Sequence, residues 1–265
     1  MLSPCRNSGD SPTRQRTPGY IRSIILFLVF LFCDPGLFAA EAFPFQMPEV
    51  FNYDLAWTGV KAGEASLGIR EDGDGITITS TAKSSKWVSV FYTVDDIVES
   101  RLRKNQEPGG LVLPVSYRLN IREGRYRKNK EVIFDQRNEK VLYIDHLEKE
   151  RNEFAVPAAV FDPMSSFYYL RTLDLKVGSS VYVTIFDSKK VWNVEVQVLR
   201  KEEIEVPAGH FNTIVVKPLL KSEGIFFRRG EIYIWLTDDE KRLPVMLKTK
   251  VKVGWVTASL VGGMF

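Results

Sequence analysis

Residues 64–82, EASLGIREDGDGITITSTA, indicate the fold most clearly. The runs Glu64–Arg70 and Ile76–Ala82 flank a segment of acidic residues and glycines, Glu71-Asp72-Gly73-Asp74-Gly75. Such a segment between two β-branched runs is typical of a β-hairpin. In Ile76–Thr81 apolar and hydroxyl side chains alternate, as they do in a strand that is buried on one face.

The same pattern recurs along most of the chain and predicts a mainly β protein. Further strands are expected at Phe51–Trp57, Val94–Arg103, Val115–Arg122, Arg125–Phe134, Lys140–His146, Val181–Phe186, Val191–Ile204, Thr213–Leu220, Gly230–Thr237, Leu243–Val253 and Gly254–Val261. Many strands joined by short polar turns favour a curved antiparallel sheet, forming a half-barrel to barrel-like domain that hides its edges.

One short central helix is expected. Asp162 can cap it, Pro163 suits its first position, and Met164–Thr172 continues it. Its apolar stripe favours docking on the sheet, with a lid over a cavity as the alternative, and Arg171 is expected to keep its charge in water. The stripe consists of Met164, Phe167, Tyr168 and the stem of Arg171.

Lys83–Tyr92 fits either a short helix or an aromatic-rich loop. Because aromatic side chains are usually buried, Trp87, Phe91 and Tyr92 are expected to pack inward.

The N-terminus has the layout of a secretory signal peptide. Arginines precede the apolar run Ile24–Phe32, and Ala40 and Ala42 suit cleavage after residue 42. The run is shorter than the roughly 20 residues of a membrane-spanning helix. A lipoprotein signal at Cys33 is the alternative, although Phe32 replaces the small residue expected before a lipidated cysteine. Residues 43–265 are then one exported, cysteine-free domain with no transmembrane span.

Common catalytic chemistry is difficult to build from these residues. The chain has only two histidines, His146 and His210, and the predicted domain has no cysteine, so neither a metal site nor a Ser-His hydrolase is expected. Asp95-Asp96 and Asp238-Asp239 are the paired carboxylates to consider for glycoside hydrolysis. Asp95 and Asp96 are adjacent on a predicted strand, so their side chains should point to opposite faces and not converge. Asp238-Asp239 fits a turn, where Asp side chains bond their own backbone. We expect no catalytic residue, metal or cofactor.

Aromatic side chains are the candidates for lining an apolar cavity, with simple core packing as the alternative. They are Trp57, Trp87, Phe91, Phe167, Tyr168, Trp192, Trp235 and Trp255. An outer-membrane barrel is a further alternative, because such barrels often end in phenylalanine, as this chain does with Phe265. Charged residues in the predicted strands, however, would interrupt any continuous lipid-facing band.

Basic residues cluster in the hairpin around residue 124. The net charge of the whole chain is only +3, which does not suggest nucleic-acid binding. The basic residues are therefore either solvated strand charges or a patch for an anionic envelope partner. The cluster consists of Arg122, Arg125, Arg127, Lys128 and Lys130.

Several turn and cap motifs resemble a known family. Val206-Pro207-Ala208-Gly209, Trp235-Leu236-Thr237-Asp238-Asp239 and Leu243-Pro244-Val245 are similar to an exported bacterial family, domain of unknown function 3108, as is Asp162-Pro163-Met164-Ser165-Ser166. The resemblance covers about residues 50–262 and implies a periplasmic or outer-membrane-associated protein, without implying an activity. The Trp-x-x-Asp turn followed by Leu-Pro is also similar, more weakly, to periplasmic lipoprotein carriers of the LolA/LolB type.

These features together favour a non-enzymatic periplasmic binding or carrier protein that shelters an apolar, lipid-like envelope molecule. A structural or assembly role, in which the basic hairpin captures an envelope protein, is the first alternative. An enzyme that acts on envelope polysaccharide through carboxylates is the second.

Overall fold

The computed structural model of the protein describes residues 45–104, 111–219, 231–251 and 253–265. The chain forms two units, Met1–Leu37 and Phe38–Phe265, and every described residue belongs to the second. The expected signal segment and both cysteines lie outside the described residues, as do the expected strand ends at Leu220 and Gly230.

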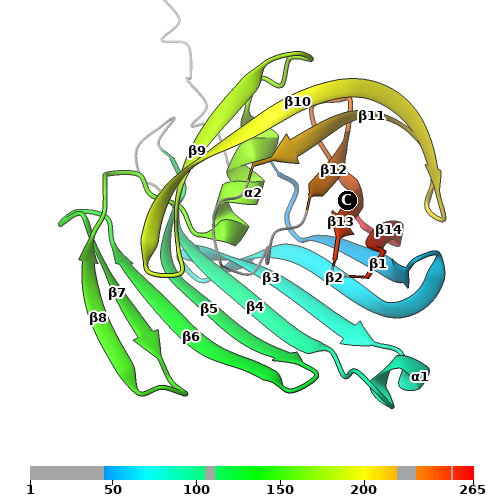
Figure 1. Ribbon diagram of the computed structural model, residues 1–265. Coiled ribbons are helices and arrows are strands. Elements are labelled where there is room, and N and C mark those ends of the chain that lie inside the picture. The colour runs from blue at the N-terminus through cyan, green and yellow to red at the C-terminus, as the bar shows by residue number, and fades with distance from the viewer. Residues whose placement is uncertain (1–44, 105–110, 220–230, 252) are drawn as a thin grey trace, which may run out of the picture. The chain divides into compact units, whose positions relative to one another are not determined.

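The described residues form one antiparallel sheet of 14 strands that does not close into a barrel. Its order is β8-β7-β6-β5-β4-β3-β2-β1-β14-β13-β12-β11-β10-β9, so the first and last strands, β1 and β14, lie side by side in the middle of the sheet (Figure 1). The strands are β1 (Glu49–Trp57), β2 (Val60–Asp72), β3 (Gly75–Ser84), β4 (Asp95–Arg103), β5 (Leu113–Glu123), β6 (Tyr126–Asp135), β7 (Lys140–Asp145), β8 (Glu150–Ala155), β9 (Ser180–Asp187), β10 (Lys190–Val206), β11 (Gly209–Pro218), β12 (Ile232–Thr237), β13 (Pro244–Lys250) and β14 (Trp255–Met264). The expectation of a curved antiparallel sheet is confirmed.

Irregularities in strand pairing bend the sheet. The register shifts between Asn52 and Tyr53 where β1 meets β14, and again between Leu55 and Ala56 where β1 meets β2. Another shift lies between Val198 and Arg200, where β10 pairs with β11. Bulges of this kind increase the local twist and bend a strand. The sheet therefore curls, and its concave side forms the inner face of the protein.

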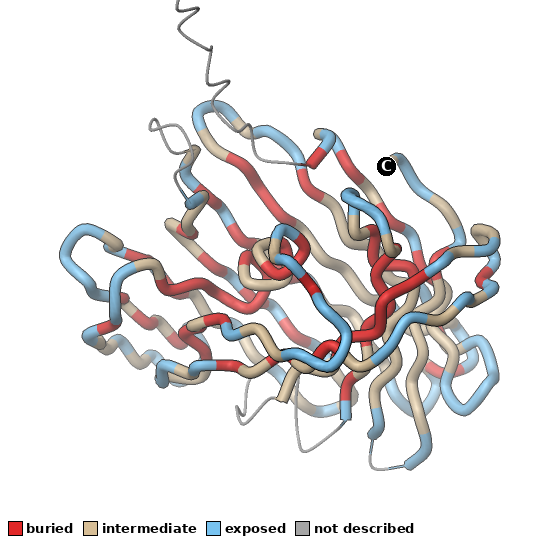
Figure 2. Tube along the Cα trace, turned by 90° about the horizontal axis from the view of Figure 1, so that it is seen from above, coloured by how far each residue is buried: buried red, intermediate tan, exposed pale blue. Residues whose placement is uncertain are grey.

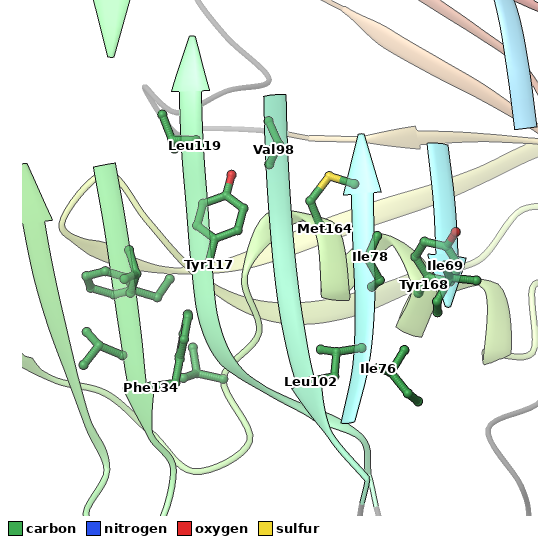
Figure 3. Close-up of a cluster of buried hydrophobic side chains, with 14 of the residues drawn as sticks. Ile69, Ile76, Ile78, Val98, Leu102, Tyr117, Leu119, Phe134, Met164 and Tyr168 are labelled. Carbon is green, nitrogen blue, oxygen red and sulfur yellow. The ribbon is translucent and has the colours of Figure 1, made fainter. Parts of the chain in front are cut away.

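The inner face carries most of the core and holds the longer helix, α2 (Pro163–Thr172). β9 and β10 stand across α2 from β3, β4 and β5 (Figure 1). Buried segments run along the strands, whereas exposed segments gather at the turns (Figure 2). Met164 and Tyr168 of α2 lie among the buried side chains of β2–β5, such as Ile69, Ile78 and Val98 (Figure 3).

The structure adds one strand, decides one open alternative and corrects one expectation. β8 was not predicted, because ERNEFA alternates charged residues with others and lacks an apolar strand pattern. Lys83–Tyr92 contains the end of β3 and a four-residue helix, α1 (Lys86–Ser89), and only Val88 of that helix is buried. Trp87, Phe91 and Tyr92 are exposed rather than packed inward, because α1 lies at the end of the sheet, beyond the inner face.

Candidate functional site

An apolar cavity lies between α2 and the inner face of the sheet. Its volume is about 220 Å³, and no charged side chain lines it. A cavity of about 150 Å³ lined by aliphatic and aromatic groups stays dry and can bind benzene. The space between α2 and the sheet is therefore large enough for an apolar group of that size or larger.

α2 presents one face to the cavity and another to the core. Pro163, Phe167 and Leu170 line the cavity. Tyr168 is fully buried in the cluster formed with β2–β7. Phe167 packs against this cluster and also against the cluster of β9–β12. The helix therefore forms one wall of the cavity and joins two of the three clusters of buried side chains.

The sheet supplies the other walls from strands that are far apart in the sequence. β9 and β10 contribute Val183 and Val196, and β12 contributes Ile234. Three small residues leave room opposite the helix, where larger side chains would fill the core. They are Ala65 on β2, Ser80 on β3 and Ala258 on β14.

Asp162 anchors the N-terminal end of α2. Its carboxylate accepts hydrogen bonds from the Met164 and Ser165 N–H groups at 2.7 and 3.0 Å, and from Ser100 Oγ of β4 at 2.6 Å. With Ser165 bonding back to the Asp162 N–H, this is a capping box, so the predicted cap is confirmed. Burial raises the pKa of Asp162, and the hydrogen bonds from Ser100 and Ser165 oppose that shift.

Arg171 anchors the C-terminal end of α2. Its guanidinium donates to both carboxylate oxygens of Glu49, at 2.7 and 2.9 Å, and to the Lys241 and Arg242 carbonyl oxygens, at 3.0 Å each. The Phe45 ring lies 4.2 Å from the guanidinium carbon. The expectation that Arg171 keeps its charge in water is wrong, because Glu49 at the start of β1 supplies a buried counter-ion.

The eight aromatic candidates do not gather at this cavity. Phe167 lines it, and Tyr168 lies behind the helix face that does so. Trp57, Trp87 and Phe91 are exposed at the end of the sheet that carries α1. The indole N–H of Trp192 donates to the Asp187 carbonyl oxygen, and the indole N–H of Trp235 donates to the Glu202 carboxylate. Trp255 is half-buried beside Tyr233.

Other cavity residues left a weaker signal in the sequence. Val183 and Ile185, Val194 and Val196, and Ile232 and Ile234 each alternate by two, which assigns them to one face of a strand. That alternation could have marked the inner face, but it could not reveal which parts of that face remain unfilled.

The five basic candidates divide between the two faces of the β5–β6 hairpin. Arg122, Arg125 and Arg127 are exposed. Lys128 and Lys130 point inward and line a small cavity of about 10 Å³ beside Tyr117 and Asp187. Lys130 also pairs with Asp145 at 3.2 Å. Only the three arginines therefore offer charge to a partner on the outer face.

The paired carboxylates make structural contacts. Asp96 accepts a hydrogen bond from the Arg122 N–H at 2.8 Å. Asp238 pairs with Lys201, and Asp239 accepts hydrogen bonds from Thr237 and the Arg242 N–H within its turn. Among the residues that the structure describes, no group of three His, Cys, Asp or Glu side chains could hold a metal ion, and no helix has the length and apolar content needed to cross a membrane.

The chain matches a family model described as protein of unknown function (DUF3108) over residues 52–261. The chain belongs to this family. The match spans the strands and α2 that enclose the cavity, and it confirms the resemblance carried by the turn and cap motifs. No match was found among curated proteins.

The first of three similar solved structures supports the fold. A β-barrel-like protein of domain of unknown function DUF1849 from Brucella abortus is 10% identical, with a TM-score of 0.52, and the match covers 82% of this chain and 97% of that one. A hypothetical protein from Chlamydia trachomatis is 8% identical with a TM-score of 0.35, covering 81% and 86% of the two chains. A candidate exported protein with a YmcC-like fold from Bacteroides fragilis is 10% identical with a TM-score of 0.32, covering 83% and 97%.

Proposed function

We propose that the protein is an exported binding or carrier protein that shelters the apolar part of an envelope molecule in the cavity between α2 and the sheet. The observation that carries this proposal is the lining of a cavity of about 220 Å³ by apolar side chains from α2 and both parts of the sheet. Apolar ligands bind in concave, mostly apolar sites of this kind.

α2 acts in this proposal as a fixed roof rather than as a swinging gate. Asp162 ties its first turn to Ser100 of β4, and Arg171 ties its last turn to Glu49 of β1. Opening the helix would break a buried ion pair and a buried cap at once. A ligand is therefore expected to enter past side chains such as Phe167 while the helix stays in place.

A cavity-filling variant tests the proposal. Leucine at Ala65 and Ala258 should fill the space opposite α2 and weaken binding of the apolar fluorescent probe 1-N-phenylnaphthylamine by about tenfold or more, since each 1.4 kcal/mol of lost binding is a tenfold change. Ala158→Leu, at an exposed position, is the matched control. Probe fluorescence during titration is the measurement.

Native mass spectrometry of the protein purified from producing cells supplies an independent test. A co-purified apolar ligand that is present in the wild type and absent from the Ala65→Leu/Ala258→Leu variant would support the proposal. Equal probe binding by all three proteins, with no co-purified ligand, would show that the cavity does not serve as a binding site.

A further inference from the structure

Exposed apolar side chains gather at one end of the sheet. At this end β1 turns into β2, α1 follows β3, and β13 turns into β14 (Figure 1). The relative exposures of Val90 and Phe91 are 81% and 70%. A concentration of exposed apolar groups marks a contact surface. We call this surface the apolar tip, and its main members are Trp57, Trp87, Val90, Phe91, Tyr92 and Val253.

Hydrogen bonds hold the turns of the apolar tip together. The indole N–H of Trp57 donates to the Val253 carbonyl oxygen at 2.7 Å, and that of Trp87 donates to the Lys61 carbonyl oxygen at 3.1 Å. The Thr58 N–H donates to the Trp255 carbonyl oxygen at 2.8 Å. Both exposed indoles therefore already have partners for their N–H groups, and their rings can leave water without losing a hydrogen bond.

The basic hairpin lies directly beside the apolar tip. The Gly124 N–H at its turn donates to the Thr93 carbonyl oxygen at 2.7 Å, next to Tyr92. Gly124 has φ +55°, and an added Cβ there would lie 2.7 Å from the Tyr92 ring. The hairpin and the segment after α1 are thus in close contact.

The arginines of this hairpin give the tip a positive margin. Arg122 and Arg125 are exposed, and with Lys86 they form no ion pair with another described residue. Of the acids at this end, Asp96 accepts a hydrogen bond from the Arg122 N–H, and Asp54 and Glu64 both pair with Lys61. Positive charge is therefore available to an anionic surface.

We propose that this end of the protein docks on a bilayer that contains anionic phospholipids. Aromatic and aliphatic side chains enter the boundary between headgroups and acyl chains, while basic residues bind the anionic headgroups. The apolar tip and the Arg122–Arg125 margin provide these two components side by side. This proposal goes beyond ligand binding in the cavity and does not depend on it.

Tryptophan quenching by brominated lipids tests docking on the full chain. All five tryptophans lie between residues 57 and 255, so the signal comes from the β-rich part and not from residues 1–44. Vesicles of phosphatidylethanolamine and phosphatidylglycerol with brominated chains should quench emission, and brominated phosphatidylcholine vesicles should quench it much less. Trp87→Phe should lower the quenched fraction while leaving binding in place.

Two pairs of substitutions separate the apolar and electrostatic contributions. Val90→Asp/Phe91→Asp should abolish quenching, whereas Tyr182→Asp, at a position 58% exposed on edge strand β9, should leave it unchanged. Arg122→Gln/Arg125→Gln should weaken vesicle binding roughly ten- to thirtyfold at low salt, and less at high salt. Circular dichroism checks that each variant is folded.

Quenching that persists in the Val90→Asp/Phe91→Asp variant, or that is equal for neutral and anionic vesicles, would overturn the proposal. Capture of a folded protein by the tip without vesicle binding would also overturn it. The Ala65→Leu/Ala258→Leu cavity variant should still dock normally, so that failure of docking and failure of ligand binding can be distinguished.

Discussion

Asp162 is a single buried carboxyl that joins the first turn of α2 to the sheet. Its two oxygens accept hydrogen bonds from N–H groups of the helix and from the hydroxyls of Ser100 and Ser165. The position of the cavity roof depends on these contacts. Because burial is the largest influence on its pKa, this residue also makes stability depend on pH.

The pKa of Asp162 in the folded protein lies above its ordinary value of about 3.9. The folded state therefore holds this proton more tightly than the unfolded state. The resulting contribution to stability is complete below the unfolded pKa and is lost as pH rises through the folded pKa. Asparagine is as good an N-cap as aspartate and does not ionise. Relative to the wild type, the Asp162→Asn variant should gain stability as pH rises from about 4 to 7.

Urea unfolding at several pH values measures this difference. Asp74→Asn, in the exposed β2–β3 turn, controls for the loss of one acidic residue. A stability difference between wild type and Asp162→Asn that does not change with pH would contradict the explanation.

The two ends of α2 show what sequence can and cannot reveal about a residue. Asp162, Pro163 and Ser165 act within one helical turn, so the cap could be predicted from local sequence. Glu49 is 122 positions from Arg171 in the chain, and only the curled sheet brings the two side chains together. Nothing near Arg171 in the sequence marks it as the partner of a buried acid.

At the scale of the element, the Arg171–Glu49 pair fixes α2 against the start of β1. Removing one partner leaves a buried charge unpaired, which typically costs about 3–5 kcal/mol. Glu49→Gln should therefore destabilise the fold strongly. Replacing both residues with apolar ones, as in Glu49→Leu/Arg171→Met, should recover much of that loss.

Urea unfolding of the wild type, Glu49→Leu, Arg171→Met and the Glu49→Leu/Arg171→Met double variant measures the coupling between the two residues. Lys176→Met, which removes an exposed partner of Asp174, is the control and should leave the free energy of unfolding almost unchanged. If the losses in stability of the two single variants add up to the loss of the double variant, the pair does not act as a unit.

Most strands could be predicted because one-sided burial imposes alternation on each strand separately. β8 was missed because it is an edge strand whose residues, such as Arg151 and Glu153, face water. The exposed aromatics around α1 were misassigned because hydrophobicity alone does not show whether a segment lies over the inner face or at a sheet end. The order of strands, with β1 beside β14, also depends on contacts between distant segments.

At the scale of the whole molecule, α2 joins two packed regions. Met164 and Tyr168 belong to the region of β2–β7, whereas Leu170 belongs to that of β9–β12. The cavity lies where these regions meet and where Ala65, Ser80 and Ala258 leave space. A cavity forms where large side chains are absent from a surface. The large aromatic residues in the sequence therefore could not indicate it, and most of them lie elsewhere.

This geometry predicts that a cavity ligand stabilises strands on both sides of α2 at once. Binding to the folded state alone adds about 2.7 kcal/mol at a ligand concentration one hundred times Kd. With 1-N-phenylnaphthylamine bound, hydrogen exchange should slow in β2 and β3 and also in β9 and β10, since all four strands line the cavity.

β7 and β8, which contribute no lining residue, should change less and serve as the internal control. The Ala65→Leu/Ala258→Leu variant should show no change in either group. Slowing confined to one side of α2 would place the ligand outside the cavity, because any group that fills the cavity must contact both regions.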